Sequence, residues 1–198
     1  MAYITQEEAR SFARTELADD LPLLVRAMAA AEAAVNEWCQ RTFVEPTGTT
    51  VRLFVPDRCS PVLRVDDIAS DNGLVILNDG AAVAAATYQL EVSLGVVNQT
   101  TRAGEARPYG YVRLLDGLWT IDGERATVSI TARWGWPATP EAVKLATLVL
   151  TRDFLLSRDV LFGMATFGAD GFTRRVGETS TVVALLEPYR TDETFGVA

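Results

Sequence analysis

The first forty residues alternate apolar and polar positions with the spacing of helices. Thr5 is followed three residues later by Glu8, a capping-box pattern that predicts a helix from Thr5 to about Glu16. Asp19 and Asp20 mark a second helix start, because acidic residues are favoured at the positive end of a helix. The chain therefore opens with two helices.

The second helix has one apolar face and many alanines. It should end near Arg41, ahead of Pro46. Residues of its apolar face recur at spacings of three and four: Leu24, Met28, Ala31, Val35 and Trp38. Cys39, beside this face, is interpreted as a small buried hydrophobic residue.

Between about Thr49 and Trp136 the apolar period changes to two, which predicts strands. Three runs carry the alternation: Val51, Leu53 and Val55; Tyr88, Leu90 and Val92; Val128, Ile130, Ala132 and Trp134. Four dipeptides typical of turns separate the runs: Asn72-Gly73, Asp79-Gly80, Asp116-Gly117 and Asp122-Gly123. This part of the chain is predicted to be an antiparallel β lobe.

A third, strongly apolar helix follows. Thr139 is the predicted cap, with Pro140 at the first helical position and Glu141 in the first turn. Its polar residues form a narrow stripe: Lys144, Thr147, Thr151 and Arg158. Such a helix must be covered on more than one side, so it is either central to the core or partly buried by another subunit.

The C-terminal part combines a glycine and aromatic segment with a short helix. Gly163, Gly168 and Gly171 are interleaved with Phe162, Phe167 and Phe172. A helix is predicted from Thr181 to Glu187, because Ser180 can cap it and Pro188 lies just beyond. Residues 191–198 are expected to be a loose tail without a place in a monomer core.

These elements give an α+β fold. Residues 1–47 and 137–161 are predicted to form a helical platform, and residues 48–136 an inserted antiparallel β lobe. Residues 162–198 are predicted to be the glycine and aromatic loop with an extended C-terminal docking tail.

Composition narrows the classes of function. The 198 residues are 48% hydrophobic and 22% charged, as in folded globular proteins, and Cys39 and Cys59 are too few for a disulfide framework. The N-terminus lacks the pattern of a secretion signal, and Lys144 and Arg152 interrupt the most apolar stretch, so we expect a soluble protein made in a cytoplasm. No membrane partner is expected.

Charge and histidine content limit the chemistry further. The net charge of −8 removes the general attraction of DNA-binding proteins for phosphate. The absence of histidine excludes histidine-dependent triads, HExxH zinc chemistry and an imidazole base. Neither a metal site nor a cofactor site is expected.

The remaining candidate residues have simpler interpretations. The acid pairs Asp19-Asp20 and Asp66-Asp67 fit a helix cap and a strand, whose neighbouring side chains point to opposite faces. Arg174-Arg175 follows a glycine-rich loop but not a P-loop, so a surface or interface pair is favoured over a phosphate site. Trp134 and Trp136 are more typical of packing than of stacking on sugars or bases. No catalytic site is predicted.

Four segments resemble a known family. The run from Arg133 to Phe154 reads RWGWPATPEAVKLATLVLTRDF and is similar to a segment of head-to-tail adaptors from siphophages of actinobacteria, in the phage head-tail connector family. Residues 162–168 (FGMATFG), residues 185–190 (LLEPYR) and the stretch from Asp19-Asp20 to Arg41 agree in order and spacing. The resemblance covers both ends of the chain and the β lobe in outline.

This resemblance implies a structural virion protein without enzymatic activity, located in the neck at the head–tail interface. Its copies would form a ring, a dodecamer, under the portal protein and extend the DNA channel. Head-closure or stopper and tail-terminator proteins would dock below it, and genomic double-stranded DNA would pass without specific binding, as an acidic chain favours. The interface residues implied for portal and subunit contacts are Phe162, Phe167, Phe172, Arg174, Arg175, Leu185, Leu186, Pro188, Tyr189 and Phe195.

Three alternatives remain. A head-closure or tail-terminator ring of the same neck is disfavoured by the long helices at both ends. A carboxylate hydrolase would depend on Asp66 and Asp67. A sugar-binding β module would require an exposed Trp134 or Trp136.

Overall fold

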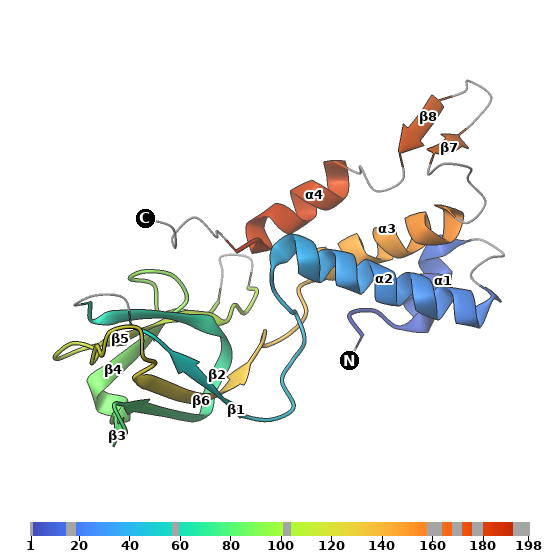
Figure 1. Cartoon of the computed structure of the whole chain (residues 1–198). Helices are drawn as coiled ribbons and strands as arrows, with labels where there is room; N and C mark the ends of the chain where they lie inside the picture. The colour runs from blue at the N-terminus through green and yellow to red at the C-terminus, as the bar shows by residue number, and fades with distance from the viewer. Residues whose placement is uncertain are drawn as a thin grey trace. The chain divides into compact units, whose positions relative to one another are not determined.

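The chain folds into two compact units. The computed structural model describes residues 2–14, 19–56, 60–100, 104–157, 164–167, 172–175 and 180–191 (Figure 1). Met1–Phe43 and Thr139–Ala198 form the helical unit, and Val44–Ala138 form the sheet unit. The antiparallel sheet is thus inserted between helices, and the predicted α+β class is confirmed.

Helix α1 (Gln6–Ala13) begins with the predicted capping box. The Thr5 hydroxyl accepts from the backbone N–H of Glu8 at 3.2 Å, and the Glu8 carboxylate accepts from the backbone N–H of Thr5 at 2.7 Å. The helix ends at Arg14, whose φ of 47° is left-handed. It therefore stops before the predicted Glu16.

Helix α2 (Leu21–Cys39) is capped by Asp20, which accepts from the backbone N–H of Leu23 at 3.2 Å. The prediction that Trp38 belongs to the buried face is wrong, because its side chain is 41% exposed. Cys39, four residues after Val35, occupies the buried position, as interpreted from its sequence context. The rest of the predicted face is buried: Leu24, Met28, Ala31 and Val35.

Helix α3 (Glu141–Ser157) packs against α1, α2 and α4 (Ser180–Leu186). Thr147 and Thr151, predicted as part of a polar stripe, are buried. Their hydroxyls donate at 2.8 Å to the carbonyls of Val143 and Thr147, one turn earlier, so burial leaves no unpaired hydroxyl. The predicted short C-terminal helix is confirmed as α4, followed by the 3-10 turn η4 (Glu187–Tyr189).

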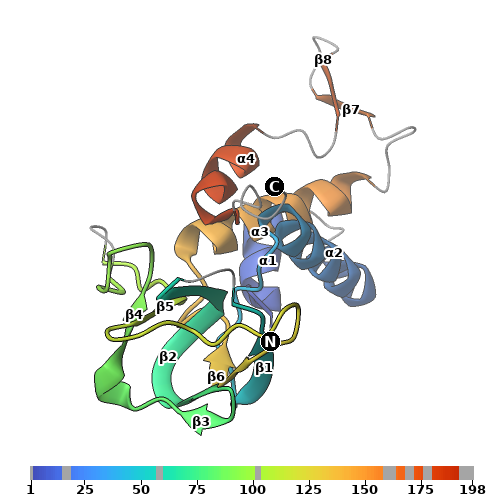
Figure 2. The same ribbon diagram turned by 60° about the vertical axis from the view of Figure 1, so that its left-hand side comes forward.

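The sheet unit contains a six-stranded antiparallel sheet (Figure 2). Its strand order is β1-β6-β2-β5-β4, with β3 paired to β2. The strands are β1 (Thr50–Phe54), β2 (Val62–Asn78), β3 (Ala81–Ala82), β4 (Tyr88–Glu91), β5 (Tyr109–Leu114) and β6 (Val128–Trp134). A 3-10 turn, η2 (Ala85–Thr87), precedes β4. Strands β1 and β4 are therefore the two edges of the ordered path.

Strand β2 is long and changes partners along its length. Its first part pairs with β5 and its later part with β6, with register shifts that include one between Ser70 and Val75. The predicted turn at Asn72-Gly73 falls inside this irregular stretch, with Gly73 at a φ of 77°, and does not end the strand. The turn predicted at Asp79-Gly80 does join β2 to β3.

The core of the sheet unit is built from alternate residues of its strands. On β6, Val128, Ile130 and Ala132 are fully buried, as the period of two predicts. Residues of this core come from strands β2, β5 and β6 and the segment after β5: Leu63, Val65, Ile68, Ile76, Val112, Leu114, Trp119, Val128, Ile130 and Ala132. On β1 the alternating apolar residues face outward instead, and Phe54 packs against the core.

Strands β7 (Met164–Phe167) and β8 (Phe172–Arg175) pair with each other in antiparallel register. Phe167 lies opposite Phe172, and Ala165 lies opposite Arg174. The segment predicted as a glycine and aromatic loop thus contains a short two-stranded sheet.

Candidate interaction surfaces

The two acid pairs have structural partners. Asp19 pairs with the exposed Arg10, and Asp20 caps α2. On β2, Asp66 accepts from Arg52 Nη1 at 2.5 Å, and Asp67 Oδ2 accepts from the Trp136 indole N–H at 3.0 Å. Each carboxylate therefore has a contact that explains it without catalysis.

Two further features bear on the classes of site. Among the described residues, no group of three or more His, Cys, Asp or Glu side chains is placed to hold a metal ion. No helix in the described ranges has the length and apolar character needed to cross a bilayer.

The tryptophans near the end of β6 are engaged within the sheet unit. Trp136 is 1% exposed. The ring of Trp134 lies beneath the Arg52 guanidinium, at 4.7 Å from its carbon to the ring centroid, and beside Phe54 at 5.7 Å. These contacts remove the free aromatic platform that the sugar-binding alternative requires.

Gly135 allows the chain to turn between these two tryptophans. Its φ is +143°, and a Cβ there would lie 2.5 Å from the carbonyl oxygen of Val44. Its backbone N–H donates to the carbonyl of Asp67 at 2.8 Å. A glycine is required at this position because the backbone of a neighbouring segment occupies the space of a side chain.

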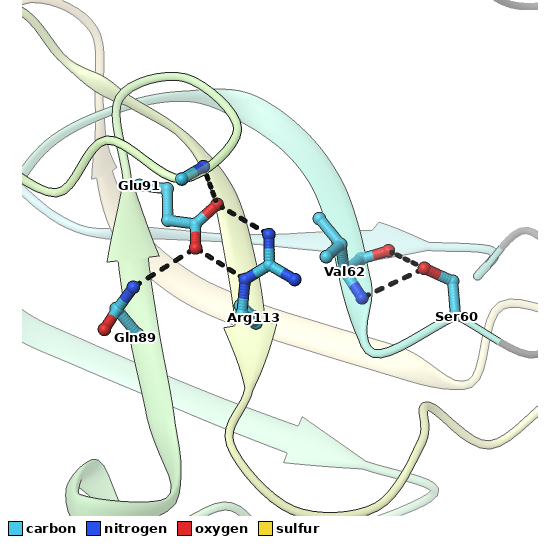
Figure 3. Close-up of polar contacts among 6 residues, drawn as sticks. Ser60, Val62, Gln89, Glu91 and Arg113 are labelled. Atoms are coloured by element: carbon cyan, nitrogen blue, oxygen red, sulfur yellow. Dashed lines mark hydrogen bonds and ion pairs between the residues drawn. The ribbon is translucent and has the colours of Figure 1, made fainter.

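A buried ion pair links strands β4 and β5 (Figure 3). Glu91 is fully buried and accepts from Arg113 Nε at 2.6 Å and Nη2 at 3.1 Å. It also accepts from Gln89 Nε2 at 3.2 Å and from the backbone N–H of Gly95 at 2.9 Å. The hydrogen bonds from Arg113 hold the pKa of Glu91 below its ordinary value and raise that of Arg113.

The contact of Glu91 with Gly95 shapes the turn that follows β4. Val92 donates to the carbonyl of Val96 at 2.7 Å, and Val96 donates to the carbonyl of Ser93 at 2.8 Å. Gly95 has a φ of 79°, which suits glycine. The turn therefore presents Leu94, Val96 and Val97 to solvent while a buried carboxylate holds its backbone.

Residues Glu91 and Arg113 were not among the predicted site residues. A period of two in β4 places Glu91 with Gln89 on the polar side of the strand, and the sequence contains no signal for its partner. Only the pairing of β4 with β5, which sets Glu91 opposite Tyr111 and Gln89 opposite Arg113, brings the two charges together.

The outer face of β1 is a second exposed apolar surface. Val51 and Leu53 are 59% and 67% exposed, and Val55 just beyond the strand is 48% exposed. Val51 and Val75 both pair with Thr131 of β6, so they lie in one row across three strands. We call Val51, Leu53, Val55 and Val75 the β1 face.

The segment after α4 is fastened to the helical unit. Tyr189 meets Phe43 edge to face at 5.9 Å, and the Arg190 guanidinium lies 5.4 Å from the ring centroid of Trp38. The backbone N–H of Thr191 donates to the carbonyl of Cys39 at 3.1 Å, and its hydroxyl accepts from Arg41 Nε at 2.8 Å. Burial raises the pKa of the Cys39 thiol to about 11.

Part of the expected docking tail is instead packed within the helical unit. Leu186 and Tyr189 are buried within the helical unit, Leu185 is half-buried, and Pro188 is exposed. Phe162 and Phe195 lie outside the described residues. The other predicted interface residues lie on β7 and β8: Phe167, Phe172, Arg174 and Arg175.

The sequence left open whether α3 is central to the core or partly buried by another subunit, and its burial supports the first possibility. Val143, Ala146, Leu150 and Leu155 are buried within its own unit, so the helix is central to that core. Leu145 remains 41% exposed. Helices α1 and α3 border an open groove of about 700 Å³ lined by Glu7, Glu8, Ser11, Phe12, Arg14, Leu148 and Arg152.

Comparison with known proteins gives likenesses at the level of structure. No family model matches the sequence, and no curated protein matches it. A chain from the structure "Neck of empty GTA particle computed with C6 symmetry" superposes with a TM-score of 0.58 and 18% identity, covering 98% of this chain and 93% of that chain. The fold is that of a chain in a neck assembly.

Two further structures carry similar chains. "Neck of native GTA particle computed with C12 symmetry" has a TM-score of 0.52 at 16% identity, covering 88% of this chain and 85% of that one. "Virion of native gene transfer agent (GTA) particle" has a TM-score of 0.54 at 19% identity, covering 98% and 93%. The likeness extends over both units.

Proposed function

We propose that this chain is a structural neck protein, a head-to-tail adaptor whose copies form a ring beneath the portal of a phage-like particle. The observation that carries the proposal is the structural likeness over 98% of the chain to a chain of a gene transfer agent neck. The ordered sequence segments similar to siphophage adaptors point to the same role. In this role the protein acts through its shape and its contacts and catalyses no reaction.

In this role the helical unit is the ring platform, and the ring continues the channel toward the tail. A dodecamer is proposed, in line with the twelvefold symmetry named for one similar structure. The net charge of −8 suits a channel for double-stranded DNA, because an acidic wall offers no counterion-release affinity to phosphates. Head-closure and tail-terminator proteins are the proposed partners on the tail side.

The portal-facing contacts are proposed to come from the C-terminal part. Phe162, Phe167, Phe172, Arg174, Arg175, Leu185, Pro188 and Phe195 keep their proposed interface role. Leu186 and Tyr189 act instead by holding α4 and η4 on the helical unit, since both are buried there. They therefore contribute to docking indirectly, by positioning exposed neighbours such as Pro188.

The test is reconstitution with the portal ring of the same particle. Purified full-length chain mixed with portal rings should add one layer at the narrow end, visible by cryo-electron microscopy, with a copy number given by native mass spectrometry. A layer found one level further from the portal would assign the chain to the head-closure or tail-terminator class. Failure to join any neck layer would overturn the proposal.

A further inference from the structure

Exposed apolar surface is concentrated in the sheet unit and not on α3. Among the described residues, ten of the fifteen exposed large hydrophobic residues lie between Val44 and Ala138. They form three groups: Val51, Leu53, Val55 and Val75; Leu94, Val96 and Val97; Leu115, Leu118 and Ile121. Isolated exposed hydrophobic residues need no explanation, but neighbouring ones are candidates for contact surfaces.

Strand β1 itself contains no lysine or proline, although Pro56 follows Val55 of the β1 face. Lysine, proline and inward charges blunt edge strands in monomers, yet the only charged residue of β1 is Arg52. Arg52 is engaged with Asp66 and Trp134, while Val51 and Leu53 point away from them as alternate residues of the strand. Thr131, which lies between the two valines of the row on β6, is uncharged, and Arg133 follows two residues later on the same side of that strand.

The turn at residues 93–97 is exposed, yet hydrogen bonds fix much of its backbone. Its backbone bonds are internal, and the buried Glu91 carboxylate accepts the N–H of Gly95. Because the turn is already ordered, burying Leu94, Val96 and Val97 in a contact costs little further conformational entropy. A preorganised, uncharged, exposed turn of this kind is suited to pack against another apolar surface.

The two surfaces lie at opposite edges of one sheet. In the order β1-β6-β2-β5-β4, the β1 face belongs to one edge and the turn directly follows the strand at the other edge. Figure 2 shows β1 and β4 separated by the intervening strands. A ring requires two different patches on each subunit, so that each copy contacts the next head to tail.

We propose that the β1 face of one copy receives the 93–97 turn of the next copy, which makes the sheet unit a head-to-tail contact of the ring. The occupant is a second copy of this chain because the residues that define both surfaces are apolar and one sheet unit carries the two surfaces at its opposite edges, as a closed ring requires. This inference rests on the proposed ring function and identifies its interface.

Photo-crosslinking of the full-length chain tests the contact even if association is weak. Leu53 is replaced by benzoylphenylalanine, and the chain is mixed at high concentration with an equal amount of ¹⁵N-labelled unmodified chain. Irradiation should give mixed-isotope crosslinks that mass spectrometry maps to residues 92–97 of the labelled copy. The matched control carries the same replacement at Leu118, another exposed leucine of the sheet unit, and should not label that segment.

Two charge variants complete the test. The crosslink should be lost when the labelled partner carries Val96→Glu and kept when it carries Leu118→Glu. Circular dichroism and thermal unfolding of each variant verify its fold. Crosslinks from position 53 to β1 of another copy, to any other segment, or no more than the Leu118 control gives, would each overturn the inference.

The outcome separates this inference from the proposed function. If the chain joins a portal ring but the crosslinks map elsewhere, the neck role stands and the sheet-unit contact is wrong. If the head-to-tail crosslink forms but the chain never attaches to a portal or neck layer, the contact stands and the neck role fails.

Discussion

Arg113 donates two hydrogen bonds to the buried carboxylate of Glu91, from Nε at 2.6 Å and from Nη2 at 3.1 Å. The side chain of Glu91 is 1% exposed, whereas that of Arg113 is 32% exposed. Glu91 is the more buried member and therefore depends more on the ion pair than Arg113 does. Its carboxylate also accepts from the backbone N–H of Gly95, so it links the β4–β5 pairing to the turn that follows β4.

Replacing Glu91 should destabilise the protein and loosen this turn. We expect Glu91→Gln to lower the free energy of unfolding by about 2 kcal/mol or more, because the arginine loses its charged partner and a buried amide gains unmatched donors. Denaturant unfolding measures the change. Asp122→Asn is the matched control, since its ion pair with Arg125 is exposed and should be worth less than about 1 kcal/mol. Equal effects of the two variants would contradict the role of burial.

The same ion pair should make stability depend on pH. The folded pKa of Glu91 lies below its ordinary value of 4.5, first because Arg113 hydrogen bonds to it. A carboxylate with a lowered folded pKa stabilises the fold fully above the unfolded pKa, and this stabilisation is lost as pH falls through the folded pKa. The difference in unfolding free energy between wild type and Glu91→Gln should therefore shrink from about pH 6 to about pH 3. Parallel pH profiles would show that the carboxylate contributes nothing as an ion.

Gly135 should not tolerate a side chain. Gly135→Ala places a Cβ 2.5 Å from the carbonyl oxygen of Val44 at a φ of +143°, so we expect a loss of about 2–4 kcal/mol in unfolding free energy. Gly48→Ala is the control, because nothing lies within 4 Å of its added Cβ, and it should change stability by no more than about 0.5 kcal/mol. A neutral Gly135→Ala would mean that the backbone relaxes easily at this corner.

Two truncations should separate folding from docking at the C-terminus. A stop after Gly177 removes the buried Leu186 and Tyr189 and should cost at least about 3 kcal/mol of stability. A stop after Thr191 keeps every contact of α4 and η4 described above and should leave the melting temperature near that of the full chain. Thermal unfolding and portal attachment are measured on both. If the chain that ends at Thr191 melts normally but fails to attach to the portal, residues 192–198 carry a docking function.

Several local elements could be predicted from the residues alone. Thr5 with Glu8, Asp20 ahead of α2 and Asp79-Gly80 between strands act through contacts only a few residues apart, and all three are present. The alternation that predicts a strand at β6 agrees with the burial of Val128, Ile130 and Ala132, while Trp134 at its end is only partly buried. Asn72-Gly73 was mistaken for a strand end, because the neighbouring strands keep β2 paired on both sides of it.

Burial was predicted less well wherever it depended on a partner distant in sequence. The Trp38 side chain is exposed beneath Arg190, and the Val51 and Leu53 side chains face outward although their alternation resembles that of β6. Surplus apolar surface was expected on the third helix and the trailing segment. Among the described residues, most of the exposed apolar side chains lie on the sheet unit, whereas α1, α2 and α4 pack against α3. Much of the trailing segment lies outside the described residues.

By itself, the sequence determined the caps of the first two helices, most turns, the change of period from helix to strand and back, and the exclusion of histidine-dependent chemistry. These features depend on neighbours along the chain or on composition alone. The tertiary structure decided that Glu91 meets Arg113, that Leu186 and Tyr189 close onto the helical unit, and which side of β1 faces solvent. Each of these is a pairing of segments far apart in sequence, and a residue's own propensity carries no information about such a partner.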